Sequence, residues 1–218
     1  MSTAVALLSG GLDSGTGLAM WLEREAAAVA ECVTFDYGQR AAVLECAAAR
    51  ALAGRFGLPW RRVELSWLAD AAVRAGSSLV SGGGVLPDRA GAQTVGDEDS
   101  AAAVWVPARN LVFLAIGAAF AESVGADVVV AGFNREEAAT FPDNSAEFVA
   151  AFDAVAKLGT RNSVAVESPT IGMTKAEVVA AARRHGMTEE DFWSCYDGGP
   201  GICGKCESCV RSRLAWGV

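Results

Sequence analysis

Positive charge and long hydrophobic runs are both scarce in this sequence of 218 residues. There are 18 lysines and arginines against 26 aspartates and glutamates, and this formal net charge of −8 argues against an extended nucleic-acid surface, which needs clustered cations. The apolar runs are too short and too interrupted for a membrane span, and the N-terminus lacks the basic region of a secretory signal. We therefore expect a cytoplasmic protein that contacts neither nucleic acid nor membrane.

Cysteine is also sparse over most of the chain, because four of the six cysteines fall in the last 24 residues. This distribution argues against disulfides that staple the whole domain and favours a metal site. Cys32 and Cys46 stand apart and fit as small core residues. With 52% apolar residues the chain can bury one full core, so we expect a main domain over residues 1–186 and a small C-terminal segment over 187–218.

The stretch SGGLDS at residues 9–14 stands between an apolar run over 3–8 and a helical pattern over 15–28. Two adjacent glycines let a backbone approach a bulky anion, and a helix that follows offers unpaired N–H groups and the positive end of its dipole. Asp13 can hold a magnesium ion that shares the phosphate charge. The Walker A spacing is absent, so the pattern predicts a phosphate-binding loop of another kind. A glycine turn that only caps a helix is the alternative.

Apolar strands alternate with helical patterns over the first 65 residues. Strands are expected over 29–35 and 60–65, with a helix over 40–56 between them. This order predicts parallel βαβ units with right-handed crossovers. Ligands bind beyond the carboxyl ends of the strands in such sheets, so the 9–14 loop and the segment 36–39 are expected at the same edge.

The second half of the chain continues the alternation after a long polar insertion. Residues 74–104 are rich in serine, glycine and acidic residues and predict about 30 residues of loop, either a lid or a disordered excursion. Asn144 or Ser145 can cap the helix that follows, and Thr174 with Glu177 has the spacing of a capping box. One helix is expected to open within 106–110, with Pro107 near its start, and to run to about residue 124. Further helices are expected over 145–158 and 174–185, and strands over 127–132 and 163–167.

Four cysteines near the C-terminus form the pattern C-x7-C-x2-C-x2-C: Cys195, Cys203, Cys206 and Cys209. Zinc prefers four thiolates in a tetrahedron, and C-x-x-C turns bring two sulfurs to one metal. A site with four cysteine ligands is closed, which predicts a structural role in pinning this segment. An iron–sulfur cluster and a redox pair are the alternatives.

Three basic residues stand near predicted helix ends. Arg109 at a helix start is unfavourable to the helix dipole, so an anion is its expected partner. Lys175 opens the helix over 174–185 and is either a phosphate contact or a solvated lysine. His185, the sole histidine, fits a surface role at the C-terminus of that helix.

Together these segments resemble the 7-cyano-7-deazaguanine synthase family of PP-loop ATP pyrophosphatases, which serves queuosine and archaeosine biosynthesis. The resemblance covers nearly the whole chain and is carried by LLSGGLDSGTGL at 7–18, FDYGQR at 35–40, VPARNLVFL at 106–114, GFN at 132–134, FPD at 141–143, TKAE at 174–177, and SCY with CGKCESC at 194–209.

The resemblance implies a fold and a reaction. The fold is an α/β Rossmann-like parallel sheet of the adenine nucleotide alpha hydrolase type with a small C-terminal zinc-binding tail. The reaction converts 7-carboxy-7-deazaguanine and ammonia to the nitrile through an acyl adenylate and an amide, and it releases AMP and pyrophosphate. A homodimer is also implied. A PP-loop ligase or sulfurtransferase that acts on tRNA or another carboxylate, and a non-catalytic nucleotide-binding module, are the alternatives.

The resemblance also assigns residues to ATP, to catalysis, to substrate and to metal. The residues that it places at ATP are Leu8, Ser9, Gly10, Gly11, Leu12, Asp13, Ser14, Gly15, Thr16, Gly17, Leu18, Phe35, Tyr37, Gly38 and Gln39. Those that it marks as catalytic are Asp13, Ser14, Arg109 and Lys175, with Mg²⁺ as a cofactor. Those that would bind the deazapurine substrate are Arg109, Phe133, Asn134 and Asp143. The zinc ligands would be Cys195, Cys203, Cys206 and Cys209.

One segment departs from the family pattern. Many members have Tyr-Pro-Asp-Cys-Arg where this chain has Phe-Pro-Asp-Asn-Ser at 141–145, and the sequence Arg-Glu-Glu at 135–137 is also atypical. The pocket is therefore expected either to hold the substrate differently or to hold another carboxylate.

Overall fold

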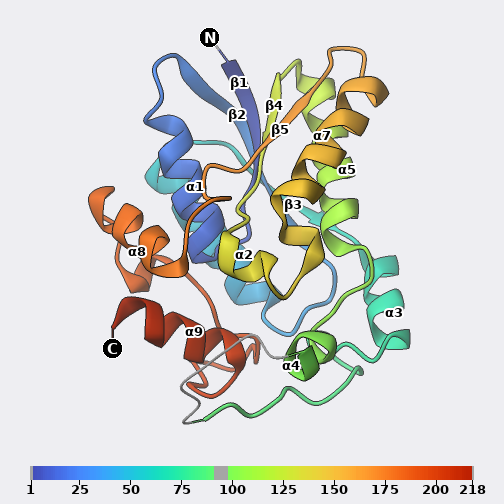
Figure 1. Cartoon of the computed structure of the whole chain (residues 1–218), viewed down its shortest axis with the longest axis vertical. Coiled ribbons are helices and arrows are strands. Elements are labelled where there is room, and N and C mark those ends of the chain that lie inside the picture. The colour runs from blue at the N-terminus through green and yellow to red at the C-terminus, as the bar shows by residue number, and fades with distance from the viewer. Residues whose placement is uncertain (1, 91–97, 218) are drawn as a thin grey trace.

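A parallel five-stranded sheet forms the centre of the molecule (Figure 1), as a computed structural model shows for residues 2–90 and 98–217. Every neighbouring pair of strands in the sheet is parallel, and their order is β3-β2-β1-β4-β5. The predicted α/β class with a parallel sheet is thus confirmed. The strands are β1 Ser2–Leu7, β2 Ala27–Asp36, β3 Trp60–Glu64, β4 Val128–Val130 and β5 Ala165–Glu167.

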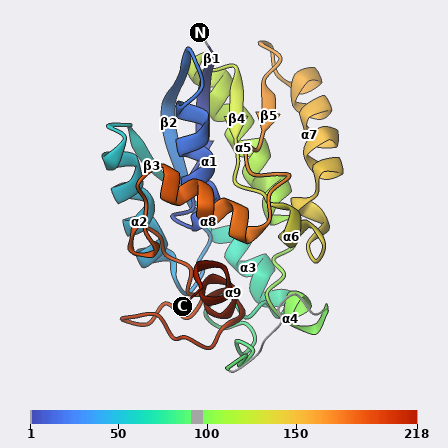
Figure 2. The same cartoon turned by 60° about the vertical axis from the view of Figure 1, so that its left-hand side comes forward.

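Helices cover both faces of the sheet (Figures 1 and 2). Along β1 the side chains alternate, so Val5 packs into the core beneath α5 while Ala4 and Ala6 pack into the core beneath α1 and α8. Both sets are buried, which explains why the strands read as continuous apolar runs rather than as alternating ones. The main helices are α1 Leu12–Leu22, α2 Ala42–Arg55, α5 Arg109–Val124, α7 Ala146–Gly159 and α8 Lys175–Arg184.

Shorter helices lie in the connections and in the C-terminal segment. The sequence patterns did not predict any of them, because each is short or packs a weakly apolar face. They are α3 Ser66–Arg74, α4 Glu98–Ala103, α6 Arg135–Ala138, α9 Glu207–Trp216 and the 3₁₀ turns Pro142–Asn144 and Glu189–Asp191. No helix in the described ranges combines the length and the apolar character needed to cross a membrane.

Helix α1 begins earlier and ends earlier than predicted. Gly11 is its N-cap, with extended backbone, so Leu12–Ser14 of the loop motif already form the first helical turn. At the other end the chain reverses at Ala26, which has a positive φ of 59°, and β2 starts directly after it. The first turn of α1 therefore faces the carboxyl edge of the sheet.

The long polar insertion over residues 74–104 is only partly a loop. Residues 91–97 lie outside the described residues, and the predictions for them stay untested. The part before them is attached to Arg40, whose backbone N–H donates to Leu79 O at 2.8 Å and whose Nε donates to Ser78 O at 2.9 Å. The part after them contains α4.

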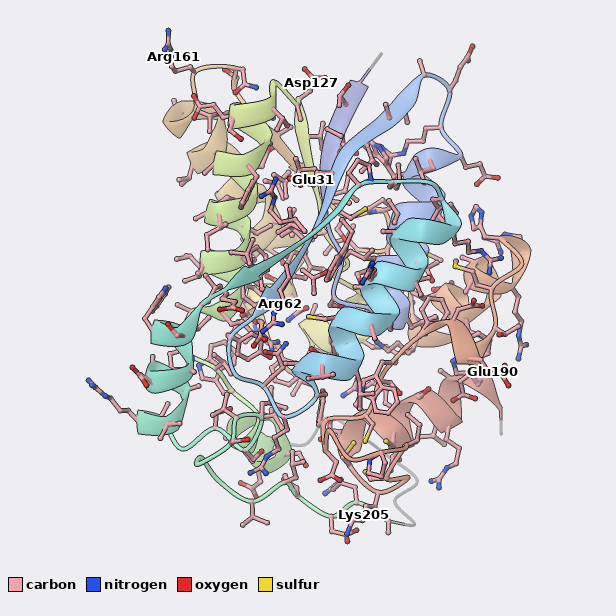
Figure 3. The ribbon with its side chains drawn as sticks, turned by 180° about the vertical axis from the view of Figure 1, so that it is seen from behind. Glu31, Arg62, Asp127, Arg161, Glu190 and Lys205 are labelled. Atoms are coloured by element: carbon pink, nitrogen blue, oxygen red, sulfur yellow. The ribbon has the colours of Figure 1, made fainter. Side chains whose placement is uncertain are left out.

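The strand order creates a crevice between β1 and β4. The chain builds outward through β2 and β3, then returns to the other side of β1 with β4 and β5. Ligands of open parallel sheets bind at such a reversal, at the carboxyl ends of the strands. In Figure 3, Asp127 and Arg161 mark the amino end of the sheet, and Lys205 of the C-terminal segment lies at the opposite end. The C-terminal segment therefore covers the end where ligands are expected.

The predicted capping box of α8 is present. Thr174 Oγ1 accepts from the backbone N–H of Glu177 at 3.2 Å, and Glu177 Oε2 accepts from the N–H of Thr174 at 2.7 Å. The Thr174→Ala variant is expected to lower the free energy of unfolding by about 1 kcal/mol, because a first-turn amide loses its acceptor. Denaturant unfolding followed by circular dichroism measures this. Thr188→Ala is the control, since its box closes only a three-residue 3₁₀ turn and should cost less.

Candidate active site

A cavity of about 250 Å³ lies at the carboxyl ends of β1, β2 and β4. It is the place that the strand order predicts for a ligand. Many of the predicted site residues line it, from five different segments of the chain. Those residues are Leu8, Ser9, Gly11, Leu12, Asp13, Ser14, Phe35, Tyr37, Gln39, Arg109, Phe133 and Lys175.

The loop after β1 is held in shape by its own serines. Ser14 Oγ lies 2.9 Å from Ser9 Oγ, accepts from Ser9 N at 3.1 Å and donates to Gly11 O at 3.2 Å. Gly10 has a φ of +84°, and a Cβ there would lie 2.4 Å from Glu45 O, so this position requires glycine. Gly11 has no side chain to accept from the first amides of α1, which leaves these N–H groups for an anion.

Three charged side chains meet at the floor of the cavity. Lys175 Nζ, at the start of α8, donates to Asp13 Oδ2 and to Glu137 Oε1, the latter at 2.7 Å. Burial opposes the charge of Glu137, but Lys175 and Arg211 lower the pKa of Glu137 to about 2. Burial raises the pKa of Asp13, and Lys175 only partly counters this. The lysine is thus held by two carboxylates instead of being solvated.

Arg109 and aromatic rings form one wall of the cavity. Arg109 Nη1 donates to Tyr37 Oη at 3.2 Å, and its guanidinium carbon lies 5.9 Å from the centroid of the Tyr37 ring. Phe35 and Phe113 stack beside them, with ring centroids 4.3 Å apart. A cation next to flat apolar rings suits a planar, negatively charged ligand such as a purine carboxylate.

A third carboxylate, that of Glu45, also lines the cavity. Gln39 Nε2 donates to Glu45 Oε2 at 2.8 Å, while Gln39 Oε1 accepts from the N–H of Tyr37 at 2.9 Å. Burial raises the pKa of Glu45 against the effect of this hydrogen bond. The glutamine thereby fixes both the turn after β2 and a carboxylate at the cavity.

The C-terminal segment, with α9 at the bottom of Figure 2, supplies part of the lining of the cavity. The N–H of Trp193 donates to Gly10 O at 2.9 Å, which attaches the segment to the phosphate-binding loop itself. Phe192 packs so tightly on α1 that a Cβ on Gly15 would lie 2.7 Å from its ring. The lining residues from this segment are Trp193, Ser194, Tyr196, Ser208 and Ser212.

The four C-terminal cysteines come together as predicted. Their sulfur atoms all lie within 4.8 Å of one another, with Cys203 and Cys209 at 3.8 Å and Cys206 and Cys209 at 3.3 Å. The backbone N–H groups of Cys203 and Cys206 donate to the sulfurs of Cys195 and Cys203 at 3.4 and 3.3 Å. Such donors favour thiolates, the form that binds a metal.

Some predicted site residues do not line the cavity. Asn134 is the N-cap of α6 and accepts from Glu137 N, and the backbone carbonyl of Asp143 accepts from Asn110 Nδ2 at 3.3 Å. Gly38 is exposed in the turn after β2 and has a φ of +80°. Gly10 packs against α2 and its carbonyl accepts from Trp193 N–H, and the rest are buried within α1: Gly15, Thr16, Gly17 and Leu18. Their assigned roles stay predictions.

Other residues at the cavity were missed by sequence reasoning. Glu137 was noted only as atypical, and Glu45 carried no signal beyond its place on a helix. Gly132 closes the gap between β4 and α1, since a Cβ there would lie 2.4 Å from Ser14 N. The remaining lining residues that were missed include Asn110, Phe113, Asn144, Trp193, Tyr196, Ser208 and Ser212.

Comparison with known families shows to which one the chain belongs. The family described as "Queuosine biosynthesis protein QueC" matches residues 3–217. The chain belongs to the QueC family. The "7-cyano-7-deazaguanine synthase" of Methanothermobacter thermautotrophicus is 42% identical over 214 residues, which cover 98% of this chain and 93% of that protein. The protein of the same name from Pelotomaculum thermopropionicum is 47% identical over 213 residues, covering 95% and 93%. This QueC-family chain is accordingly an enzyme.

Two solved structures share the fold. The U34-tRNA thiolase NcsA from Methanococcus maripaludis, with its [4Fe-4S] cluster, aligns with a TM-score of 0.53 and 14% identity. A 4-thiouridine synthetase in complex with RNA and ATP aligns with a TM-score of 0.55 and 20% identity. Nearly all of this chain is covered, 98% and 99%, but it spans only 63% and 53% of those proteins. These similarities establish the PP-loop fold alone.

Proposed function

We propose that this QueC-family enzyme converts 7-carboxy-7-deazaguanine and ammonia to 7-cyano-7-deazaguanine with ATP. One observation carries the proposal: the Ser9–Ser14 loop, Lys175 and Arg109 open into one cavity with stacking rings beside them. An anion-binding loop, two cations and a flat apolar wall are what a nucleotide and a planar carboxylate need together. The names of the relatives supply the substrate.

The proposed chemistry solves a leaving-group problem. A carboxylate oxygen leaves poorly, so the substrate carboxylate first attacks the α-phosphorus of ATP and expels pyrophosphate, giving an acyl adenylate. Ammonia then adds to the carbonyl carbon and AMP leaves, which gives the amide. The amide oxygen attacks a second ATP, and loss of AMP with two protons forms the nitrile. In total, two ATP become two AMP and two pyrophosphate.

Each step needs positioning and charge stabilisation more than a protein nucleophile. The free N–H groups at the start of α1 would hold the departing pyrophosphate. Lys175 keeps a third ammonium donor for a phosphate oxygen, since two are used by carboxylates. Arg109 would hold the substrate carboxylate or the α-phosphate. The Phe35–Gln39 turn would lie by the adenosine, and Phe133 would stack on the deazapurine.

A magnesium ion fits this site on one observation. Asp13 Oδ1 is buried and has no hydrogen-bond partner among the described residues, and a carboxylate oxygen is the ligand that Mg²⁺ prefers. Asp13 would therefore hold the ion that accompanies ATP. Bound there, the ion would neutralise the charge that develops on the phosphates.

The cysteine cluster fits zinc better than an iron–sulfur cluster. A tetrahedral zinc ion with Zn–S bonds of about 2.3 Å places its sulfurs about 3.8 Å apart. The sulfurs here, all within 4.8 Å of one another, suit one ion, whereas four iron and four sulfide atoms need more room. The four cysteines would fill the coordination sphere, so the role of the ion would be structural.

Product stoichiometry tests the function directly. The purified protein, incubated with ATP, ammonium and 7-carboxy-7-deazaguanine, is expected to release two AMP for each nitrile, because two oxygens must be activated. Liquid chromatography with mass detection measures both products, and the amide should appear before the nitrile. A ratio of one, with the amide as end product, would contradict the second adenylation.

A different acceptor is the alternative that the departures at residues 135–137 and 141–145 keep open. Turnover of ATP to AMP with tRNA or another carboxylate, and none with the deazapurine, would favour it. Sulfur transfer would need a cysteine at the cavity, and outside the metal cluster the chain has only Cys32 and Cys46, which do not line it. ATP binding without any AMP would favour a non-catalytic module.

The remaining expectations concern assembly and location. We expect a homodimer that contacts neither nucleic acid nor membrane, in the cytoplasm. The acidic net charge of −8 supports the absence of a nucleic-acid partner. Light scattering during size-exclusion chromatography decides the oligomeric state.

A further inference from the structure

Two consecutive glutamates of α6 contact the same lysine. Glu137 Oε1 lies 2.7 Å from Lys175 Nζ, and Glu136 Oε1 accepts from the backbone N–H of Lys175 at 3.0 Å. Asn134, the N-cap of α6, accepts in turn from the N–H of Glu137 at 3.0 Å. The ammonium and the backbone of Lys175 are therefore both held from one short helix that is fixed at its own start.

Asp13 shares this lysine with Glu137. The side chains of Lys175, Asp13 and Glu137 are only 11%, 14% and 26% exposed, and all three line the cavity. One oxygen of Asp13 contacts the ammonium, while the other is buried and has no hydrogen-bond partner in the described part of the chain. The Lys175 ammonium and a metal ion would compete for the Asp13 carboxylate, because both are cations and both would be attracted strongly to it at short range away from water.

We infer that Glu137 is a positioning residue whose carboxylate neutralises the Lys175 ammonium and so leaves Asp13 available to the metal that accompanies ATP. The inference rests on the proposed ATP-dependent function. With Glu137 in place, the ammonium keeps a partner when Asp13 turns to a divalent cation. Without the charge of Glu137, Asp13 is the one carboxylate left within 4 Å of Lys175 Nζ among residues 2–90 and 98–217.

The sign of the effect separates this role from a structural one. A carboxylate beside the phosphate-binding lysine repels the bare ATP anion and favours a divalent cation. Removing its charge while keeping its shape, as in Glu137→Gln, should therefore tighten the binding of metal-free ATP and weaken the binding of Mg²⁺. A loosened or misfolded site would weaken both.

Calorimetric titration with ATP tests this, once with EDTA and once over a series of Mg²⁺ concentrations. For Glu137→Gln we expect metal-free ATP to bind about threefold to tenfold more tightly, and half-saturation by Mg²⁺ to need about tenfold more ion. Glu137→Asp keeps the charge and should restore the wild-type pattern at least in part. Glu147→Gln, which removes one charge from an exposed position on α7, is the matched control and should change neither quantity.

Two outcomes would overturn the inference. One is an unchanged Mg²⁺ dependence in Glu137→Gln, and the other is equal weakening of metal-free and Mg²⁺-loaded ATP binding. A different result would refute the proposed function. If wild-type protein binds ATP but forms no nitrile, the reaction is refuted, and the binding titrations still test the role of Glu137.

Discussion

Asp13→Ala is expected to lower kcat/KM for nitrile formation by about 10²- to 10³-fold, the cost of removing one preorganised charged group from a reaction that develops phosphate charge. Asp13 stands in the first turn of α1 at the cavity, with one oxygen on Lys175 and the other buried without a partner among the described residues. Each of the two adenylations needs the same group, so both amide and nitrile should disappear. Steady-state release of AMP measures the loss.

The fold of the Asp13→Ala variant should stay intact. Lys175 keeps Glu137 as its partner, so no buried ammonium is left unpaired. Burial already raises the pKa of Asp13, which means that the folded state disfavours its charge, and its removal should not lower the melting temperature. Asp13→Asn should lose activity equally, and Asp70→Ala, exposed on α3, should lose none. Full activity in Asp13→Ala would refute the assignment of the loop.

Loss of the metal is expected to weaken ATP binding strongly and to abolish activity. The cysteines connect the Trp193–Tyr196 segment to α9, and both supply walls of the cavity. Without the ion, no bond links the four cysteines to one another. The segment that carries Trp193 is then less firmly fixed, and its hydrogen bond to Gly10 O is weakened. Cys206→Ser should therefore contain less than one zinc per chain and bind ATP at least about 100-fold more weakly, because several contacts are lost together.

Elemental analysis and calorimetry measure these two losses. Cys46→Ala is the control, because Cys46 lies on α2 outside the cluster and its removal should leave one zinc per chain. Chelation followed by added zinc should reverse the loss in the wild type. Iron in place of zinc, or full activity of the metal-free protein, would contradict the proposal.

The sheet and the loop were predictable because local patterns encode them. An apolar run, a glycine-rich turn and a helix in succession specify β1, the anion loop and α1, and repeated alternation specifies the parallel sheet. Helix caps were equally predictable from the sequence, since Ser145 accepts from Phe148 N at 3.1 Å and Thr174 closes its capping box. The exact start of α1 was wrong, because Leu12–Ser14 look like loop in sequence yet form a helical turn once Gly11 caps it.

The walls of the cavity were less predictable because they depend on tertiary contacts. The C-terminal segment was expected only to bind a metal, whereas it also supplies Trp193, Tyr196 and two serines of α9 to the cavity. No pattern near those residues signals an ATP site. The role of Glu137 likewise depends on its contact with Lys175, which lies 38 positions away in sequence.

The position of α9 beneath the sheet also affects how the enzyme folds during its synthesis. The anion loop leaves the ribosome before α9 does. Domains begin to fold during synthesis from the N-terminal side, so the sheet can assemble while the pocket still lacks its lower wall. A message cut short before the codon for Glu207 would thus yield all five strands of the sheet with an open, inactive pocket.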